Sequence, residues 1–307
     1  MELPDFKQLE QDKTTLPDWA KYMEDGEFIS YDNTYQSKIY FDLFDKYSFA
    51  CEETGDITYY VYDPVKHGAD ANKTYPVLMW LHGASNSLMG DGCIMCCGAE
   101  QYASPQYQKS MGGAYLIVPL ANEQRLENGE IIGCWSEEYS KPVKAIYDKV
   151  CAENAQNIGK RFVMGASAGG YFTWKLLEDY GDYFAGAIPI SSYYLPEQSV
   201  LERLVASGIH LLIAQGQHDE FVPFEEVFAP RAESIEKLPN CIAFFPKWVY
   251  NGDGGISSVF YGREMGQHCM INWVQHNLIF DDGTPADDRL SEGVTGWVKD
   301  ISAYGVN

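Results

Sequence analysis

The chain has few basic residues for its length. Lysine and arginine together number 22 among 307 residues, against 44 aspartates and glutamates, so the formal net charge is −22 at pH 7. A protein with this charge repels the phosphates of nucleic acids and the surface of anionic membranes. We therefore expect neither nucleic acid nor a membrane as a partner, and we expect the acidic surface to favour solubility.

Long apolar runs are also missing. No segment approaches the roughly 18 apolar residues of a transmembrane helix. Residues 1–7 are acidic and polar, and they lack the apolar region of a signal peptide. The sequence as it stands therefore predicts a cytoplasmic protein, and secretion is the alternative if a signal peptide has been removed.

No complete metal-binding pattern is present. The eight cysteines are compatible with a reducing compartment. Cys93, Cys96 and Cys97 form a Cys-x-x-Cys-Cys run, but no second Cys-x-x-Cys and no histidine pair at zinc spacing accompanies it. The pattern favours small free thiols packed under a loop, with structural zinc as the alternative. Disulfides are a further alternative in an exported protein.

Internal repeats, linkers and changes of composition are absent as well. The chain is 46% hydrophobic and 14% aromatic, which is typical of a globular protein. We predict one main domain over residues 39–307. Residues 1–38 carry aromatic side chains among many charges, and we expect them to form an arm or a short helix that packs on this domain.

Short apolar runs alternate with helical patterns along the main domain. The predicted strands are residues 76–81, 114–119, 161–165, 185–190, 209–214 and 241–245. The predicted helices are residues 99–110, 137–157, 171–180, 196–207, 225–238 and 294–304. This alternation indicates an α/β fold with a mostly parallel sheet covered on both faces. Aromatic and β-branched residues within 39–63 predict an antiparallel hairpin or meander at the edge of that sheet.

A Gly-x-Ser-x-Gly motif at residues 165–169 joins one predicted strand to the next helix. A serine on such a sharp turn requires close backbone approach, which Gly165 and Gly169 allow because they have no Cβ. The turn places Ser167 at a helix N-terminus, where free N–H groups favour a developing anion. We predict that Ser167 is a nucleophile. An ordinary glycine-rich loop is the alternative.

Two further strand ends supply candidate partners for this serine. Chemistry in an open α/β sheet gathers at the carboxyl ends of its strands. Asp219 follows the strand at 209–214 and is predicted to orient an imidazole, with Glu220 as a rival carboxylate. His268 lies in a loop beyond the last predicted strand and is the predicted base, with His276 as a rival.

A third strand end, His82-Gly83-Ala84, follows the strand at 76–81. A turn there can present the backbone N–H group of Gly83 or Ala84 to an oxyanion, together with the N–H group of Ala168. We expect His82 to support this loop and not to transfer protons.

The chain order Ser167, Asp219, His268 is the order found in α/β-hydrolases. The sequence resembles this superfamily, and within it the single-domain esterases that include feruloyl esterases, polyhydroxybutyrate-depolymerase-like esterases and predicted serine peptidases. The resemblance runs from about residue 75 to the C-terminus, and the first 60 or so residues lie outside it. The matching segments are residues 81–83, 165–170, 184–191 and 216–223, with His268.

The resemblance implies an α/β-hydrolase fold and a serine carboxylesterase activity. Ser167 would attack an acyl carbonyl with His268 as general base and Asp219 orienting the imidazole. Amides at Gly83 or Ala84 and at Ala168 would bind the oxyanion, and water would release the acyl group. Such an enzyme acts on a small-molecule ester and needs no metal and no organic cofactor.

The sequence also differs from the lipases, which are relatives within this superfamily. Lipases often carry His-Gly-Gly-Gly where this chain has His-Gly-Ala-Ser, and no long apolar lid follows residue 190. We therefore expect small or aromatic acyl groups, such as acetyl or hydroxycinnamoyl, and not long chains. Trp135, Tyr193 and Trp248 are predicted to bind substrate, with ordinary packing as the alternative. The rival functions are a serine peptidase acting on small peptides and a binding protein with a degenerate hydrolase fold.

Overall fold

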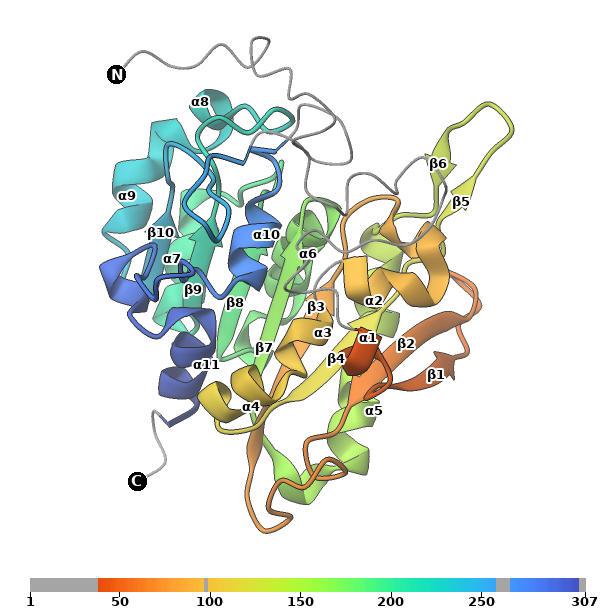
Figure 1. Cartoon of the computed structure of the whole chain (residues 1–307). Coiled ribbons are helices and arrows are strands. Elements are labelled where there is room, and N and C mark those ends of the chain that lie inside the picture. The colour runs from red at the N-terminus through yellow and green to blue at the C-terminus, as the bar shows by residue number, and fades with distance from the viewer. Residues whose placement is uncertain (1–37, 97–98, 258–265, 304–307) are drawn as a thin grey trace.

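The computed structural model describes residues 38–96, 99–257 and 266–303, apart from a few side chains at the margins of these ranges (Figure 1). Residues 1–37 of the expected N-terminal arm lie outside them.

Among the described residues, eight strands form one sheet in the order β1-β2-β4-β3-β7-β8-β9-β10. Only β2 runs antiparallel to its neighbours, and the remaining pairs are parallel. The expected parallel sheet with an antiparallel N-terminal edge is therefore confirmed. The strands are β1 (Asp45–Phe49), β2 (Ile57–Tyr62), β3 (Tyr75–Leu81), β4 (Tyr115–Pro119), β7 (Ile158–Ala166), β8 (Gly186–Ile190), β9 (His210–Ala214) and β10 (Cys241–Phe244).

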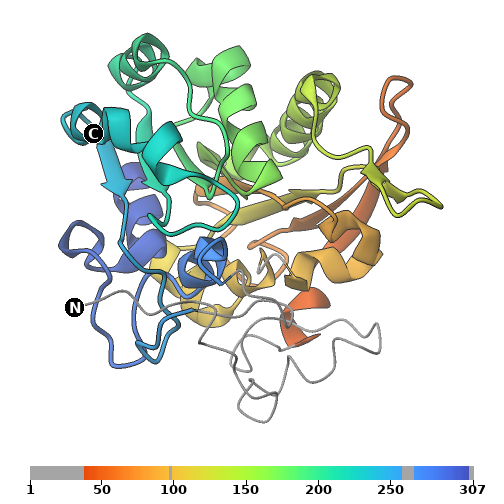
Figure 2. The same cartoon turned by 90° about the horizontal axis from the view of Figure 1, so that it is seen from above.

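Helices cover both faces of this sheet (Figure 2). One face is packed by α5 (Ser140–Glu153), α6 (Ala168–Tyr180), α7 (Gln198–Ala206), α8 (Phe224–Val227) and α9 (Ala232–Glu236). The other face is packed by α2 (Cys93–Cys96), α3 (Ala99–Tyr102), α4 (Pro105–Met111), α10 (Met270–Gln275) and α11 (Gly293–Ala303), with α1 (Lys38–Phe41) at its margin.

The central strand β3 shows how the sequence produces these two layers. Val77, Met79 and Leu81 contribute to the core on the α5–α6 face. Leu78 and Trp80 contribute to the core on the α11 face. Because alternate side chains of a strand point to opposite faces, a strand buried on both faces must be apolar throughout. This is why the run at 76–81 predicted a strand correctly.

Prolines break two of the predicted helices. The helix expected at 99–110 is α3 and α4, and α4 begins anew at Pro105, with the Ser104 side chain accepting from the Tyr107 N–H. The helix expected at 225–238 is α8 and α9, separated by a 3₁₀ turn that contains Pro230. Proline lacks the N–H group that would continue a helix, so each helix ends before it and restarts.

Three further elements differ from the sequence predictions. The expected hairpin within 39–63 is β1 with β2, whereas the segment Lys38–Phe41 is the helix α1. A small second hairpin of β5 (Gln124–Arg125) and β6 (Ile131–Ile132) projects from the body (Figure 1), and the sequence analysis did not predict it. The short helix α10 was also missed.

The turn between β7 and α6 is packed too tightly for side chains. A Cβ at Gly165 would lie 2.4 Å from the carbonyl oxygen of Gly169, and one at Gly169 would lie 2.1 Å from the carbonyl oxygen of Leu81. Gly170 is similarly confined, because its Cβ would lie 2.5 Å from the carbonyl oxygen of Ile190. These contacts join the turn to the neighbouring strands β3 and β8, so the glycines of the motif are required by packing.

Gly169→Ala is expected to lower the free energy of unfolding by about 3 kcal/mol, because the added methyl group must displace backbone atoms of β3. Urea denaturation measures this change. Gly255→Ala is the matched control, because its Cβ would meet only the side chain of Asp253, at 3.1 Å. A Gly169→Ala variant as stable as the control would contradict the packing argument.

Candidate active site

Ser167 lies between β7 and α6 in a strained backbone conformation. Its φ is 55° and its ψ is −115°, outside the regions that non-glycine residues commonly adopt. The Ser167 N–H donates to the carbonyl of Ile190 at 2.8 Å, and the Ser167 carbonyl accepts from the Tyr171 N–H at 3.0 Å. These two hydrogen bonds and the glycine packing hold the serine in place against a strain of about 1–3 kcal/mol.

The side chains of Ser167, His268 and Asp219 lie within hydrogen-bonding distance of one another. His268 Nε2 is 3.0 Å from Ser167 Oγ. His268 Nδ1 is 2.9 Å from each carboxylate oxygen of Asp219. With Nδ1–H donating to the carboxylate, Nε2 is left as the acceptor for the serine proton. The three residues follow β7, β10 and β9, so the carboxyl edge of the parallel strands brings them together.

The carboxylate of Asp219 is held from several sides. Its side chain has 0% exposed surface. One oxygen accepts from the backbone N–H groups of Phe221 and Val222, each at 2.9 Å, and the other accepts from Gln215 Nε2 at 2.9 Å. A buried carboxylate without such donors would carry a large desolvation cost. The donors also fix the orientation that the imidazole requires.

The rival carboxylate, Glu220, contacts the backbone of the histidine loop. Its two oxygens accept from the N–H groups of Gln267 at 3.0 Å and His268 at 2.7 Å. The Ser191 hydroxyl donates to the His268 carbonyl at 2.9 Å. Burial raises the pKa of Glu220 above its usual value, although the N–H donors oppose that shift. Glu220 and Ser191 therefore hold the peptide groups on both sides of the imidazole.

The rival imidazole, His276, is paired elsewhere. Its Nε2 is 2.9 Å from Asp281 Oδ1, in the segment that follows α10. Beside His268 the structure places the ring of Phe221, edge to face at a centroid distance of 4.9 Å. The Phe221 side chain is 60% exposed, so it forms an accessible apolar wall next to the imidazole.

His82 is fully buried and both of its ring nitrogens are engaged. Nδ1 donates to the carbonyl of Gly83 at 2.7 Å, and Nε2 accepts from the N–H of Ala121 at 3.0 Å. Burial lowers the pKa of His82, which keeps the imidazole neutral. These contacts tie the turn after β3 to the segment after β4, which is a supporting role for this histidine.

The turn after β3 passes beside Ser167. A Cβ on Gly83 would lie 3.6 Å from the Cβ of Ser167. The N–H groups of Ser85 and Ser87 donate to the Glu123 carboxylate, and the N–H of Asn86 donates to the carbonyl of Gly83. Within the described part of the chain, the amide of Ala84 has no such acceptor. Because Ala168 begins α6, its N–H has no partner within the helix either.

The three predicted substrate-binding residues differ in their surroundings. Trp135 is buried, stacks on Phe172 with ring centroids 4.9 Å apart, and donates to the carbonyl of His82 at 2.9 Å. Trp248 is buried against the ring of His218. Tyr193 is 54% exposed and stacks on Tyr171, one helical turn beyond Ser167. Of the three, only Tyr193 offers a large accessible surface.

Glu123 is a candidate site residue that the sequence analysis missed. Its role depends on hydrogen bonds to residues 36 and 38 positions earlier in the chain, for which the sequence gives no periodic or motif signal. The one available signal was its position, four residues after the carboxyl end of β4.

Neither a metal-binding cluster nor a membrane-spanning helix is found in the described ranges. There, no group of three or more histidine, cysteine, aspartate or glutamate side chains is placed to hold a metal ion. No helix in these ranges is both long enough and apolar enough to cross a membrane. Cys93 is buried and forms no disulfide with another described cysteine. The side chains of Cys96 and Cys97, the other members of its run, lie outside what the structure describes.

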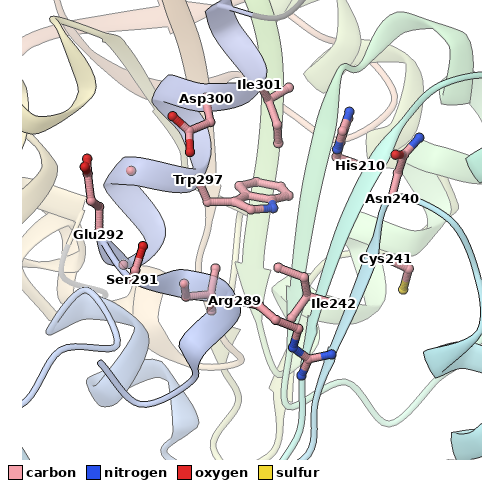
Figure 3. Close-up of a pocket in the computed structure, with 13 residues that line it drawn as sticks. His210, Asn240, Cys241, Ile242, Arg289, Ser291, Glu292, Trp297, Asp300 and Ile301 are labelled. Atoms are coloured by element: carbon pink, nitrogen blue, oxygen red, sulfur yellow. The ribbon is translucent and has the colours of Figure 1, made fainter. Parts of the chain in front are cut away.

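A separate hollow of about 370 Å³ lies between α11 and the amino ends of β9 and β10 (Figure 3). It is on the sheet edge opposite Ser167. Its polar side chains point apart in Figure 3, and Arg289 is already engaged by Asp287 and by the carbonyl of Ala243. This hollow therefore does not belong to the serine site.

Comparison with known proteins gives a structural likeness only. No protein-family model matches the chain, and no curated protein matches it. Among solved structures, a thermostable esterase is 24% identical with a TM-score of 0.52, over 68% of this chain and 56% of that one. A ferulic acid esterase is 15% identical with a TM-score of 0.52, over 84% of this chain and 97% of that one.

The chain thus spans little more than half the length of the thermostable esterase and nearly all of the ferulic acid esterase. At these identities the likeness concerns the fold. The strand order, the single antiparallel neighbour pair on each side of β2, and a serine at a strained turn between strand and helix agree with it. The chain has the α/β-hydrolase fold.

Proposed function

We propose that the protein is a serine hydrolase that cleaves carboxylic esters through an acyl-enzyme, with residues 39–307 as its catalytic domain. The observation that carries the proposal is the chain of contacts from Ser167 Oγ through His268 to Asp219, at 3.0 Å and 2.9 Å. This is the arrangement that activates a hydroxyl nucleophile. The names of the two structural neighbours, both esterases, support ester hydrolysis.

In the first half of the reaction, Ser167 Oγ attacks the acyl carbon while His268 Nε2 takes its proton. The imidazolium that forms is stabilised by Asp219 through Nδ1–H. Negative charge on the carbonyl oxygen is bound by the N–H groups of Ala168 and of Ala84 or Gly83. His268 Nε2 then gives its proton to the departing alcohol oxygen.

In the second half, a water molecule takes the place of the alcohol. His268 Nε2 removes a proton from this water as its oxygen attacks the acyl carbon of the ester formed on Ser167. The tetrahedral intermediate uses the same N–H donors, and its collapse returns the proton to Ser167 Oγ. The acid product leaves and the resting enzyme is restored, so every step uses groups that the chain itself supplies.

The substrate that we propose is an ester with a small or aromatic acyl group, such as acetyl or hydroxycinnamoyl. Two accessible aromatic rings support this class. Phe221 contacts the ring of His268, and Tyr193 stacks on Tyr171 beyond the nucleophile. Both rings are more than half exposed, so a planar group of the substrate could pack on them.

Ser167→Ala is expected to lower kcat/KM for p-nitrophenyl acetate by about 10³-fold or more, because the nucleophile is lost while binding groups remain. Initial rates at several substrate concentrations measure this loss. Ser207→Ala changes an exposed serine at the end of α7 and is the control, with activity expected at the wild-type level. Ester cleavage that persists in Ser167→Ala would reject the proposed nucleophile.

A panel of acetyl, butyryl and feruloyl esters, tested beside labelled di- and tripeptides, is expected to show turnover of the esters and none of the peptides. The reason is that an alcohol leaves the tetrahedral intermediate more easily than an amine, so an ester requires less stabilisation of the transition state than an amide does. Faster cleavage of the peptides than of any ester would favour a peptidase and contradict the proposed substrate class.

Glu220→Gln is expected to lower kcat roughly tenfold with little change in KM, because the amide offers one acceptor oxygen in place of two and one loop N–H loses its partner. The rate at which a fluorophosphonate labels Ser167 should fall in parallel. Glu226→Gln, at an exposed position of α8, is the control. Unchanged kcat and labelling in Glu220→Gln would show that the histidine loop does not depend on this carboxylate.

A further inference from the structure

Glu123 gathers donors from two separate segments of the chain. Its side chain lies between the turn after β3 and the base of the β5–β6 hairpin and is only 9% exposed. One carboxylate oxygen accepts from the N–H of Ser85 at 2.7 Å. The other accepts from the N–H of Ser87 at 3.1 Å and from the Ser87 hydroxyl at 2.6 Å. Burial and the Glu123 carboxylate raise the pKa of the Cys134 thiol to about 12, so this neighbour stays protonated and can donate as well.

The turn that Glu123 holds is one that the chain would not adopt easily by itself. Ser85 has a φ of 69°, in the left-handed region that costs a non-glycine residue about 1 kcal/mol or more. The carboxylate accepts from the N–H group of Ser85 itself and from that of Ser87, two residues later. It thereby stabilises the left-handed bend, and the bend fixes the direction of the peptide group that precedes it.

The same contacts determine which N–H groups of the turn can bind an acceptor outside the turn. The N–H groups of Ser85 and Ser87 point at Glu123, and the N–H of Leu88 donates to the carbonyl of Ser85. Among the residues that the structure describes, the amide of Ala84 is left without an acceptor, next to the point where Gly83 passes Ser167. Glu123 therefore binds amides on the C-terminal side of Ala84, and the described residues supply no acceptor for the N–H groups of Gly83 and Ala84.

Residues on both sides of Glu123 reinforce this attachment. The N–H of Ala121 donates to His82 Nε2 at 3.0 Å, and Trp135 Nε1 donates to the carbonyl of His82 at 2.9 Å. A Cβ on Gly133 would lie 2.2 Å from the carbonyl of Asn122, so the two ends of this segment are in direct backbone contact. The turn after β3 is thus attached to residues 121–135 by contacts from Glu123 and from residues on both sides of it.

We propose that Glu123 is a positioning residue of the oxyanion site: it holds the turn at residues 83–87 so that the Ala84 N–H faces the oxygen that becomes negative on Ser167 attack. The inference rests on the proposed hydrolase function. Glu123 touches neither the substrate nor the reacting atoms, and it acts through the backbone that it binds.

The negative charge of Glu123 allows a test, because the positioning role and simple electrostatics predict opposite changes in kcat when this charge is removed. A carboxylate close to a developing oxyanion opposes it by Coulomb repulsion, so removing the negative charge alone would speed the reaction. A glutamine, however, would turn an N–H donor toward either the Ser85 or the Ser87 N–H and loosen the turn. The positioning role therefore predicts a slower enzyme where simple electrostatics predicts a faster one.

The experiment compares Glu123→Gln with Glu127→Gln, which removes the same charge from an exposed position of the same hairpin. The measurements are kcat and KM for p-nitrophenyl acetate, Ki for trifluoroacetophenone, and Tm. In Glu123→Gln we expect kcat to fall about 100-fold, as for loss of an oxyanion donor. KM should stay within about twofold, and Ki should rise with the fall in kcat, because the bound ketone carries a tetrahedral oxyanion. Glu127→Gln should match the wild type.

Several results would overturn the inference. These are an unchanged or raised kcat in Glu123→Gln, or a lowered kcat with unchanged Ki for the ketone. If Glu123→Gln does not fold, Ser87→Ala decides the question, because it removes one donor to the carboxylate and should lower kcat and weaken ketone binding together by a smaller factor. Wild-type protein that shows no Ser167-dependent ester cleavage would refute the proposed function, and this inference with it, before any Glu123 variant is measured.

Discussion

Carboxylates that bind backbone amides of loops are the interaction on which this site depends. Asp219 accepts from the amides of Phe221 and Val222, and Glu220 accepts from those of Gln267 and His268. Glu123 accepts from two amides of the turn after β3. The N–H groups of loops have no partner strand to accept their hydrogen bonds. Leaving such a group unpaired beside a buried site would cost about 1–3 kcal/mol of folding free energy. Three acidic side chains remove that cost and fix three loops.

The serine is held by a different means, which is steric exclusion. Its turn is bounded by β3, β8 and the start of α6, at distances that leave no room for a Cβ at Gly165, Gly169 or Gly170. The strained φ of Ser167 persists because every neighbouring peptide is fixed by a strand or a helix. A rigidly held serine is thus surrounded by loops whose positions depend on charge-assisted hydrogen bonds. The geometry of the site therefore depends on steric exclusion around Ser167 and on hydrogen bonds in the surrounding loops.

Much of this architecture could be predicted from the sequence, because its signals are local. Buried strands appear as continuous apolar runs, the elbow as closely spaced glycines, and the order of Ser167, Asp219 and His268 as polar residues after strands. The catalytic roles of these three residues stay predictions. The helices broken at Pro105 and Pro230 show the limit of a periodic pattern, since one proline ended a helix that the neighbouring residues favoured.

The parts that could not be predicted depend on contacts between distant residues. Glu220 looked like a competitor of Asp219, and only the fold shows that it faces a loop 47 and 48 residues away. Trp135 looked like a pocket residue because aromatic side chains serve both purposes, and its indole N–H instead reaches the carbonyl of His82. Glu123 carried no motif at all. Such residues are recognised by their hydrogen-bond partners, which a single sequence does not contain.

The two ends of the segment that carries the projecting β5–β6 hairpin are in direct backbone contact, which limits how changes in the hairpin reach the rest of the fold. Because Gly133 closes against Asn122 and both flanks bind the turn after β3, the tip at residues 124–132 extends beyond the contacts that hold this turn, whereas Glu123 at its base takes part in them. A change in the length or composition of residues 124–132 would therefore leave the contacts that hold the turn after β3 in place. The fold thus offers an extension beside the Ser167 site whose tip can be altered separately from the base that holds the turn after β3.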